Sequence, residues 1–364
     1  MNIDNYYMSL AIQEAKKYLG YVNPNPPVGA VIVKNNEVLA IGAHQYFGGN
    51  HAEVNAINQL TSEQLQDATI YVTLEPCCHY GKTPPCVNAI LNSKIRRVVI
   101  GTLDVNPVVA SKSCQLLKEH GIEVTVGVLE TECKELIKVF AHFMKYKTPY
   151  ITYKYAMTLD GKVAADSGDS KWISNTQSRQ LCHLFRSQNM GIMVGIGTTL
   201  KDNPLLTSRN GHKTPIRIIC DSHLRIRLDS QIVQTAREYR TIIAYWDNNL
   251  TKIQQLQSYG CELLFVGKNE NNELDLKDLL VKLGQLSIDS VYIEGGPTIA
   301  TDFLKQRLVN SIQTFVCPKI IGGNENFSPV KNLNFSRMCD ALKLVNVRSQ
   351  MLGEDIFIES EVVY

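Results

Sequence analysis

The sequence predicts an α/β fold divided into two domains. Short β-rich segments and helical segments alternate along both halves of the chain, a pattern typical of helices packed on a central sheet. The alternation restarts after a short basic segment that ends in proline, Lys145-Tyr146-Lys147-Thr148-Pro149. With 364 residues, the chain is long enough for two domains that each bury a core. We therefore expect one domain over residues 1–147 and a second over residues 148–364.

Composition excludes several classes of protein. A hydrophobic content of 44% and a charged content of 20% are ordinary for a globular chain. The net charge of +2 provides no basic field of the kind that nucleic-acid-binding proteins carry. No apolar run approaches the ~18 residues of a membrane span, and the N-terminus lacks the features of a signal peptide. The ten cysteines are scattered and indicate reduced thiols. We expect a cytoplasmic protein without nucleic-acid or membrane partners.

The first half begins with a helix and then alternates between strands and helices. Apolar residues at helical spacing over residues 3–19 predict an amphipathic helix, which Gly20 ends. Three prolines in Asn23-Pro24-Asn25-Pro26-Pro27 predict a rigid loop. The expected strands are 28–33, 37–41, 69–74, 97–101 and 122–126, and the expected helices are 51–60, 86–91 and 111–120.

The second half repeats this alternation. A strand over 150–155 is followed by a turn at Asp160-Gly161, because this dipeptide favours positive backbone angles. Ser174-x-x-Gln177 predicts a capping box that opens a helix ending near residue 188. The expected strands are 191–195, 216–220, 241–245, 262–266 and 290–294, with a helix over 275–284.

The stretch from His51 to Cys86 predicts a catalytic zinc site. His51, Cys77 and Cys86 provide one imidazole and two thiolates, and Glu53 is not needed as a ligand, which leaves a position for water. An H-x-E motif followed by P-C and a second cysteine is the signature of zinc nucleobase deaminases. Glu53 would carry protons from the water to a ring nitrogen and then to the departing ammonia.

The local structure expected around these residues is specific. Residues two apart on a helix point to nearly opposite sides, so His51 and Glu53 can share one site only if His51 is the N-cap. Cys86 is expected near a helix N-terminus, where the helix dipole favours a thiolate. A structural zinc site with Cys78 or His79 as fourth ligand is the alternative. It is disfavoured because adjacent residues rarely bind one ion and Glu53 would then have no role.

A second candidate site follows a strand of the second half. In Glu294-Gly295-Gly296-Pro297-Thr298, two glycines allow close approach to a ligand, and the proline starts a helix whose free N–H groups suit a phosphate. An ordinary tight turn would explain the same residues. The dinucleotide-binding fingerprint is absent after Gly195-Ile196-Gly197, because Leu200 occupies the place of its last glycine.

Motifs along essentially the whole chain resemble the bifunctional riboflavin-biosynthesis deaminase/reductase family of bacteria. Eight residues separate Cys77 from Cys86, whereas cytidine and tRNA adenosine deaminases have a C-x-x-C spacing. The motifs of the first half are Asn23-Pro24-Asn25-Pro26, Val28-Gly29-Ala30-Val31, Pro76-Cys77 and His79-Tyr80-Gly81-Lys82-Thr83-Pro84-Pro85-Cys86. Those of the second half are Lys154 to Lys162, Ser170-Lys171-Trp172-Ile173-Ser174, Gly197 to Arg209 and Glu294 to Thr298.

The resemblance implies a fold, two cofactors and two reactions. The first domain would be a cytidine-deaminase-like three-layer sandwich that binds one Zn²⁺, and the second a dihydrofolate-reductase-like domain that uses NADPH. The substrate would be a small molecule, a diaminopyrimidinone with a phosphoribosylamino group. It would lose its ring 2-amino group, and the ribosyl group would then be reduced to ribityl. A homo-oligomer, either a dimer or a tetramer, is also implied.

The resemblance further implies the contacts of each ligand. NADPH would contact Ala156, Trp172, Thr198, Asp202, Ser222, Gly295, Gly296, Pro297 and Thr298. In the second domain the substrate would contact Lys154, Ser170, Arg186, Leu206, Arg209 and Glu294. In the first it would contact Asn23, His44 and Lys82, although a solvated loop lysine is an equal alternative for Lys82.

The sequence departs from the family pattern at three places. Cys78 replaces a common serine, Ser111-Lys112-Ser113 replaces a glycine-richer turn after Asn106-Pro107, and Asn203 replaces a common aspartate. Two rival interpretations stay open. One is a zinc deaminase of RNA or nucleosides with an unrelated second domain, and the other is an inactive ligand-binding protein.

Overall fold

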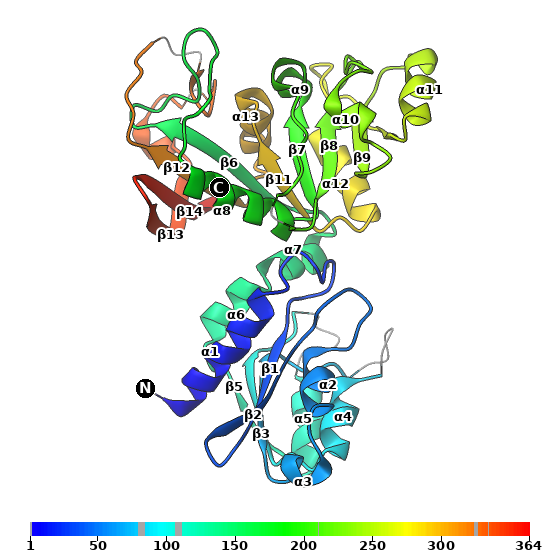
Figure 1. Ribbon diagram of the computed structural model, residues 1–364, viewed down its shortest axis with the longest axis vertical. Helices are drawn as coiled ribbons and strands as arrows, with labels where there is room; N and C mark the ends of the chain where they lie inside the picture. The colour runs from blue at the N-terminus through cyan, green and yellow to red at the C-terminus, as the bar shows by residue number, and fades with distance from the viewer. Residues whose placement is uncertain (1, 79–83, 106–110, 210, 324–326, 334) are drawn as a thin grey trace. The chain divides into compact units, whose positions relative to one another are not determined.

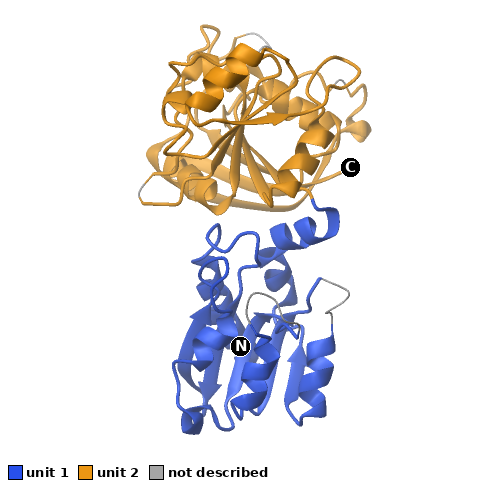
Figure 2. Cartoon of the chain, turned by 90° about the vertical axis from the view of Figure 1, so that its right-hand side faces the viewer, with its two compact units in different colours: residues 1–147 blue, residues 148–364 orange. Residues whose placement is uncertain are grey.

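The computed structural model describes residues 2–78, 84–105, 111–209, 211–323, 327–333 and 335–364. The chain forms two compact units, Met1–Lys147 and Thr148–Tyr364, which Figure 2 shows in different colours. Each unit has its own sheet and its own hydrophobic core. Within the described ranges, no helix combines the length and apolar composition needed to cross a bilayer.

Unit 1 is built on a five-stranded sheet of order β2-β1-β3-β4-β5. β1 pairs antiparallel with β2 and β3, whereas β3, β4 and β5 are parallel. The strands are β1 (Gly29–Lys34), β2 (Glu37–Ala43), β3 (Thr69–Leu74), β4 (Arg97–Thr102) and β5 (Glu123–Val126). The helices are α1 (Ile3–Lys16), α2 (Ala52–Ile57), α3 (Ser62–Leu65), α4 (Cys86–Asn92), α5 (Lys112–Glu119), α6 (Glu130–Leu136) and α7 (Lys138–Tyr146).

Helices cover both faces of this sheet, as Figure 1 shows. On one face α1 and α6 bury Tyr7, Met8 and Cys133 against the strands. On the other face α2, α4 and α5 bury a second apolar cluster that includes Val87 and Leu117. Alternate residues of each strand point to opposite faces, so both clusters draw on the same strands. The unit is the expected three-layer sandwich.

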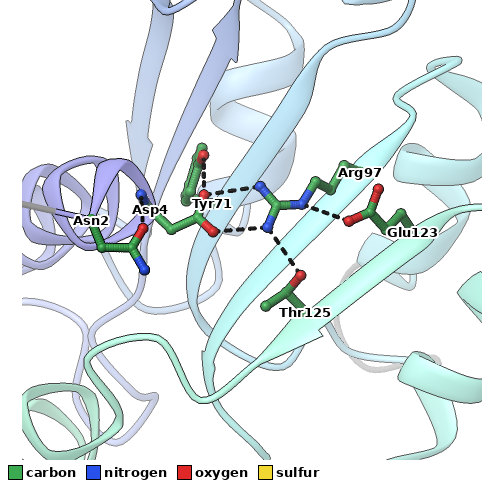
Figure 3. Close-up of polar contacts among 6 residues, drawn as sticks. All are labelled: Asn2, Asp4, Tyr71, Arg97, Glu123 and Thr125. Carbon is green, nitrogen blue, oxygen red and sulfur yellow. Dashed lines mark hydrogen bonds and ion pairs between the residues drawn. The ribbon is translucent and has the colours of Figure 1, made fainter.

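A polar cluster connects the start of α1 to β3, β4 and β5 (Figure 3). The Asp4 carboxylate accepts two hydrogen bonds from Arg97, at 2.9 and 2.8 Å, and one from the Tyr71 hydroxyl at 2.7 Å. Arg97 also donates to Glu123 and to Thr125, at 3.1 Å each. The hydrogen bonds from Arg97 are the main cause that lowers the pKa of Asp4, ahead of the opposing effect of burial. The bidentate ion pair between Asp4 and Arg97 therefore holds the first helix to the sheet.

Replacing Asp4 with Asn should destabilise unit 1 by about 1–2 kcal/mol near neutral pH, because charge-assisted hydrogen bonds to Arg97 are lost. The folded-state pKa of Asp4 lies below its usual value of 3.8, so its contribution is present above that value and is lost as the pH falls through the folded pKa. The difference between parent and Asp4→Asn in urea unfolding should therefore shrink on acidification. A difference that grows at low pH would contradict this account.

Unit 2 is built on a nine-stranded sheet of order β10-β9-β8-β7-β11-β6-β12-β14-β13. The seven strands from β10 to β12 in this order run parallel, and the β13–β14 hairpin adds antiparallel to β12. The strands are β6 (Tyr150–Thr158), β7 (Gly191–Gly195), β8 (Ile216–Cys220), β9 (Thr241–Tyr245), β10 (Glu262–Phe265), β11 (Ser290–Glu294), β12 (Ser311–Cys317), β13 (Lys343–Leu352) and β14 (Asp355–Val363).

Helices again cover both faces of the sheet. α12 and α13 pack on one face through a cluster that includes Leu279 and Phe303. α8, α10 and α11 contribute Cys182, Ile232 and Leu256 to clusters on the other face. The helices are α8 (Thr176–Gln188), α9 (Ile196–Asp202), α10 (Gln231–Gln234), α11 (Leu250–Ser258), α12 (Leu276–Gln285) and α13 (Pro297–Lys305), with a 3₁₀ turn η2 (Met338–Asp340).

The start of α8 differs from the prediction. The N-cap is Asn175, whose side chain accepts a hydrogen bond from the Ser178 N–H at 3.0 Å. The predicted box of Ser174 and Gln177 is therefore wrong by one residue. Asparagine is an equally good N-cap. The choice follows from Asp355, which accepts a hydrogen bond from the Asn175 N–H at 2.8 Å and fixes that residue outside the helix.

Candidate active sites

The three predicted zinc ligands lie together in unit 1. One ligand atom from each of His51, Cys77 and Cys86 lies within 4.8 Å of the other two. His51 Nδ1 is 3.1 Å from Cys86 Sγ and 3.5 Å from Cys77 Sγ. Within the described residues, these three form the group of His, Cys, Asp or Glu side chains whose spacing could hold a metal ion. An imidazole and two thiols converging on one point are a donor set that suits Zn²⁺.

Three structural elements bring these ligands together. His51 is the N-cap of α2, with the extended backbone angles φ −73° and ψ 164°, as expected. α2 lies directly against β2, since a Cβ at Gly42 would fall 2.5 Å from the Ala52 carbonyl oxygen. Cys77 follows the end of β3, and Cys86 is the first residue of α4. The ligands thus come from two helix starts and the end of a central strand.

Glu53 lies in the first turn of α2 and is buried, with an exposed fraction of 3%. Burial raises the pKa of its carboxyl to about 7, while the His51 imidazole acts in the opposite direction. The carboxyl also interacts by hydrogen bond with the Cys86 thiol. A carboxyl group that is held beside the metal-binding cluster but does not belong to it has the placement of a proton carrier.

Cys77 and Cys86 contact each other in a way that the sequence did not indicate. The Cys86 N–H donates to Cys77 Sγ at 3.3 Å, so the helix N-terminus stabilises the thiolate of Cys77 rather than that of Cys86. Hydrogen bonding by the Cys86 thiol is the first cause that lowers the pKa of Cys77, to about 4. The pKa of Cys86 is raised by the same interaction. The sequence led us to expect the helix N-terminus to favour the thiolate of Cys86, whereas in the structure the N–H at this helix start contacts the sulfur of Cys77.

Glu75 is a buried carboxylate that the sequence reasoning missed. Its Oε2 accepts hydrogen bonds from the Asp104 and Ser111 N–H groups, at 3.1 and 3.0 Å, and its other oxygen accepts one from the Ser113 hydroxyl. It therefore fixes both ends of the segment between β4 and α5, next to the strand that carries Cys77. The sequence feature that could have identified Glu75 is its position as an acidic residue between a buried strand and Pro76.

The predicted substrate contacts of unit 1 have different surroundings. His44 is buried, and its ring lies edge-on to that of His51 at 5.3 Å between centroids. Both His44 ring nitrogens are engaged, Nε2 with Asn25 Nδ2 and Nδ1 with the Asn50 carbonyl, at 3.0 Å each. His44 thus connects the proline-rich loop to the segment that leads into α2. Asn23 lies in that loop, and Lys82 lies outside the described residues.

Unit 2 contains a cavity of about 1120 Å³. It lies where the predicted cofactor and substrate residues converge. The predicted residues that line it are Lys154, Ala156, Ser170, Trp172, Arg186, Thr198, Asp202, Leu206, Arg209, Glu294, Gly295, Gly296, Pro297 and Thr298. Ser222 is the exception among the predicted contacts of this unit. Its carbonyl accepts hydrogen bonds from the Trp246 and Asp247 N–H groups instead.

An ion pair lies at the base of this cavity. Arg186 Nε and Nη2 donate to the two Glu294 oxygens, at 2.5 and 2.8 Å, and both side chains are largely buried. Burial disfavours the Glu294 carboxylate, but Arg186 outweighs that effect and lowers its pKa to about 2. Burial also opposes the charge of Lys154, yet Cys182 and Glu294 raise its pKa. The cavity therefore presents a fixed arrangement of charges.

The turn after β11 fits a phosphate-bearing cofactor. Gly295 and Gly296 have φ values of +80° and +76°, which L side chains rarely adopt. A Cβ at either position would lie 3.2–3.3 Å from the Thr198 side chain. α13 begins at Pro297 without a side-chain cap, so its first N–H groups face outward from the helix. The backbone is thus open to a ligand where the resemblance places NADPH.

Two further residues that line this cavity were given no role from the sequence. Asn203 has a left-handed backbone (φ +40°), and its side chain accepts a hydrogen bond from the Gln231 N–H at 2.9 Å. Asparagine tolerates this conformation, but so does aspartate, and nothing in the structure explains the asparagine in place of aspartate. His183 lines the cavity, and burial followed by Arg186 and Arg209 lowers its pKa to about 4. No motif singled it out.

Comparisons with known proteins match both units of the chain. Residues 149–358 match the sequence model of the RibD C-terminal domain, and residues 1–102 match that of the cytidine and deoxycytidylate deaminase zinc-binding region. The riboflavin biosynthesis protein RibD of Actinobacillus pleuropneumoniae is 45% identical, over 98% of this chain and 95% of its own length. That of Aquifex aeolicus is 41% identical, over 98% of each.

Solved structures match over the full chain. Acinetobacter baumannii RibD has a TM-score of 0.87 at 33% identity and covers 100% of this chain and 99% of its own. A Thermotoga maritima protein, described as a diaminohydroxyphosphoribosylaminopyrimidine deaminase/5-amino-6-(5-phosphoribosylamino)uracil reductase, has a TM-score of 0.85 at 36% identity, with 99% of each chain covered. The predicted family and the two-domain α/β fold are confirmed: the chain belongs to the RibD family of riboflavin biosynthesis proteins.

Proposed function

We propose that the chain is a bifunctional enzyme of riboflavin biosynthesis. It hydrolytically deaminates 2,5-diamino-6-(5-phosphoribosylamino)pyrimidin-4-one and then reduces the ribosyl group to ribityl with NADPH. The deaminase reaction belongs to residues 1–147 and the reductase reaction to residues 148–364. The observation that carries the proposal is the buried Glu53 beside the His51, Cys77 and Cys86 cluster. Membership of the RibD family supports the second activity.

In unit 1 the residues of the chain hold the reacting groups and move protons. His51, Cys77 and Cys86 would hold Zn²⁺, which would supply Lewis-acid activation of a water molecule. Glu53 takes the first proton of the attacking water and delivers it to the ring nitrogen, then takes the second proton of that water and delivers it to the amino group that departs as ammonia. Because this carboxyl is buried, its protons pass to the substrate rather than to bulk water. Asn23, His44 and Lys82 are the proposed substrate contacts.

In unit 2 the residues of the chain bind and orient two ligands. They would hold NADPH, which when bound would supply a hydride for reduction of the sugar C1′. The turn from Gly295 to Thr298, with Ala156, Trp172, Thr198, Asp202 and Ser222, forms the proposed cofactor site. Lys154, Ser170, Arg186, Leu206, Arg209 and Glu294 form the proposed substrate site. Arg209 is exposed within the cavity, so its planar donors are accessible to the substrate phosphate.

Supplying the purified protein with the diaminopyrimidinone phosphate tests both reactions. Ammonia should appear with or without NADPH, whereas loss of the reduced nicotinamide absorbance should require both the substrate and NADPH. Ammonia release without any NADPH oxidation would favour a deaminase with an unrelated second domain. The absence of both signals in zinc-loaded protein would favour a ligand-binding protein.

Replacing Arg209 with Ala should lower kcat/KM for NADPH oxidation by about 10²-fold or more, because charge-assisted bonds to the phosphate are lost. Ammonia release should stay at the parental rate, because Arg209 belongs to the cavity of unit 2. Arg240 provides the matched control, since it is paired on the surface with Glu262 at 2.8 Å. Equal losses of both reactions in Arg209→Ala would contradict two separate sites.

Two broader properties belong to the same proposal. We expect a homo-oligomer, a dimer or a tetramer, and the exposed edge strand β13 supports this expectation because it offers a backbone edge for pairing. Size measurement by light scattering would test it. We also expect a cytoplasmic location, which is supported by the free thiols of all ten cysteines.

A further inference from the structure

Trp172 is a large aromatic side chain that packs little against the hydrophobic core. It lies between β6 and α8, lines the cavity of unit 2, and is 62% exposed. An aromatic ring in such a position can stack on a planar ligand, but only if its orientation is fixed. Two basic residues, Arg179 and Lys319, contact this tryptophan from different elements of the fold.

Arg179 lies in the first turns of α8 and covers the indole ring. Its guanidinium carbon is 4.5 Å from the centroid of the Trp172 ring. The same guanidinium donates to the Ser174 carbonyl at 2.5 Å and to the Thr176 hydroxyl at 2.9 Å. These two bonds fix the guanidinium, and the helix start beneath it is fixed by the Asn175 cap. One side of the indole is therefore held by an anchored cation.

Lys319 holds the backbone of the same residue. Its ammonium group donates to the Trp172 carbonyl at 2.5 Å. Lys319 follows β12, and its own carbonyl accepts a hydrogen bond from the Leu159 N–H at 2.8 Å. The backbone of Trp172 is thus tied to the end of the sheet, while its side chain is tied to α8. Because Arg179 covers one side, the exposed surface of the ring includes its opposite face.

We propose that Arg179 is a positioning residue of the reductase site, holding Trp172 so that the free face of the indole stacks on a planar ring of the cofactor. The proposal rests on the proposed function, because it takes NADPH to be the ligand of this cavity. A cation within about 6 Å of an indole ring attracts it. Such a contact on one face leaves the other face available for stacking.

The tryptophan content of the chain allows a direct test. The chain has two tryptophans, so Trp246→Phe leaves Trp172 as the only one. In this background we compare two variants. Arg179→Met keeps an unbranched side chain but removes the charge. Arg179→Lys keeps the charge but loses the guanidinium that bonds both Ser174 and Thr176. Arg240→Met is the matched control, because Arg240 pairs with Glu262 away from the indole.

Two readouts separate positioning from general damage. Without ligand, Arg179→Met should lower the Trp172 fluorescence anisotropy and increase quenching by acrylamide. With NADPH, quenching of Trp172 should give a dissociation constant about three- to tenfold weaker than that of the background protein. KM for NADPH should rise by the same factor, with kcat changed less than about twofold. Arg179→Lys should give values between those of Arg179→Met and the background protein in each of these measurements. Arg240→Met should give the same values as the background protein.

The outcomes that overturn the proposal are distinct from those that overturn the proposed function. An unchanged ligand-free anisotropy in Arg179→Met overturns the positioning role, whether or not NADPH binds. A lowered anisotropy with unchanged NADPH affinity overturns the stacking role, while the reductase function survives. If the background protein itself fails to bind NADPH, the proposed cofactor is wrong and the stacking role falls with it.

Discussion

Replacing Glu53 with Gln should reduce ammonia release by about 10²- to 10⁴-fold while zinc stays bound, because general acid–base catalysis contributes a factor of this size. Glutamine has nearly the same shape and fills the buried position at the start of α2. Its amide cannot carry protons between water, ring nitrogen and ammonia. The measurements are the ammonia yield and the zinc content of each preparation.

Two controls make this prediction sharp. Glu63→Gln changes an exposed glutamate in α3 and should behave as the parent in both measurements. Glu53→Gln supplied with the already deaminated pyrimidine should oxidise NADPH at the parental rate, because that reaction belongs to unit 2. Deamination that survives in a zinc-loaded Glu53→Gln preparation would show that another group carries the protons.

Replacing Arg186 with Met should destabilise unit 2 by about 3–5 kcal/mol, since removing one partner of a buried ion pair leaves the other charge uncompensated. Glu294 is held by two hydrogen bonds from Arg186, and the pair lies within the cavity. Both tryptophans, Trp172 and Trp246, belong to unit 2, so their fluorescence reports its unfolding in urea. NADPH oxidation should be lost, whereas ammonia release should persist in the folded enzyme.

Two further variants test whether the loss of stability comes from breaking the buried ion pair. Arg240→Met breaks an exposed pair with Glu262 and should change the free energy of unfolding by less than about 1 kcal/mol. Arg186→Met combined with Glu294→Gln should be less destabilised than the sum of the single variants, because the Glu294 carboxylate is no longer left without its Arg186 partner. Additive effects would show that Arg186 acts through packing rather than through Glu294.

Fold prediction from the sequence was most accurate for buried strands. The segments 69–74, 191–195, 216–220, 241–245 and 290–294 have the predicted bounds. Their apolar runs are short, continuous and bounded by turn residues, which leaves little freedom. The strand β13 was not predicted, because it lies at the sheet edge and most of its residues are exposed. Without a buried face, no alternation marks it.

The zinc cluster was predictable because its chemistry is local to a motif. His51, Cys77 and Cys86 were identified from residue type and order, and the N-cap position of His51 followed from helix geometry. The contact from the Cys86 N–H to the Cys77 sulfur was not predictable, because it depends on how closely the start of α4 approaches the segment that follows β3. The Val87 N–H also donates to the Cys77 carbonyl at 3.2 Å, which ties the first turn of α4 to that segment.

By itself, the sequence determined the α/β class, the family and the candidate zinc ligands, because these depend on residue types at fixed spacing. Only the tertiary structure decided which side chains meet across long separations. The pairing of Arg186 with Glu294, the cover of Trp172 by Arg179 and the anchoring of Trp172 by Lys319 join residues from different elements. The physical reason is that periodicity specifies which face of an element is buried, whereas the sheet order specifies its neighbours.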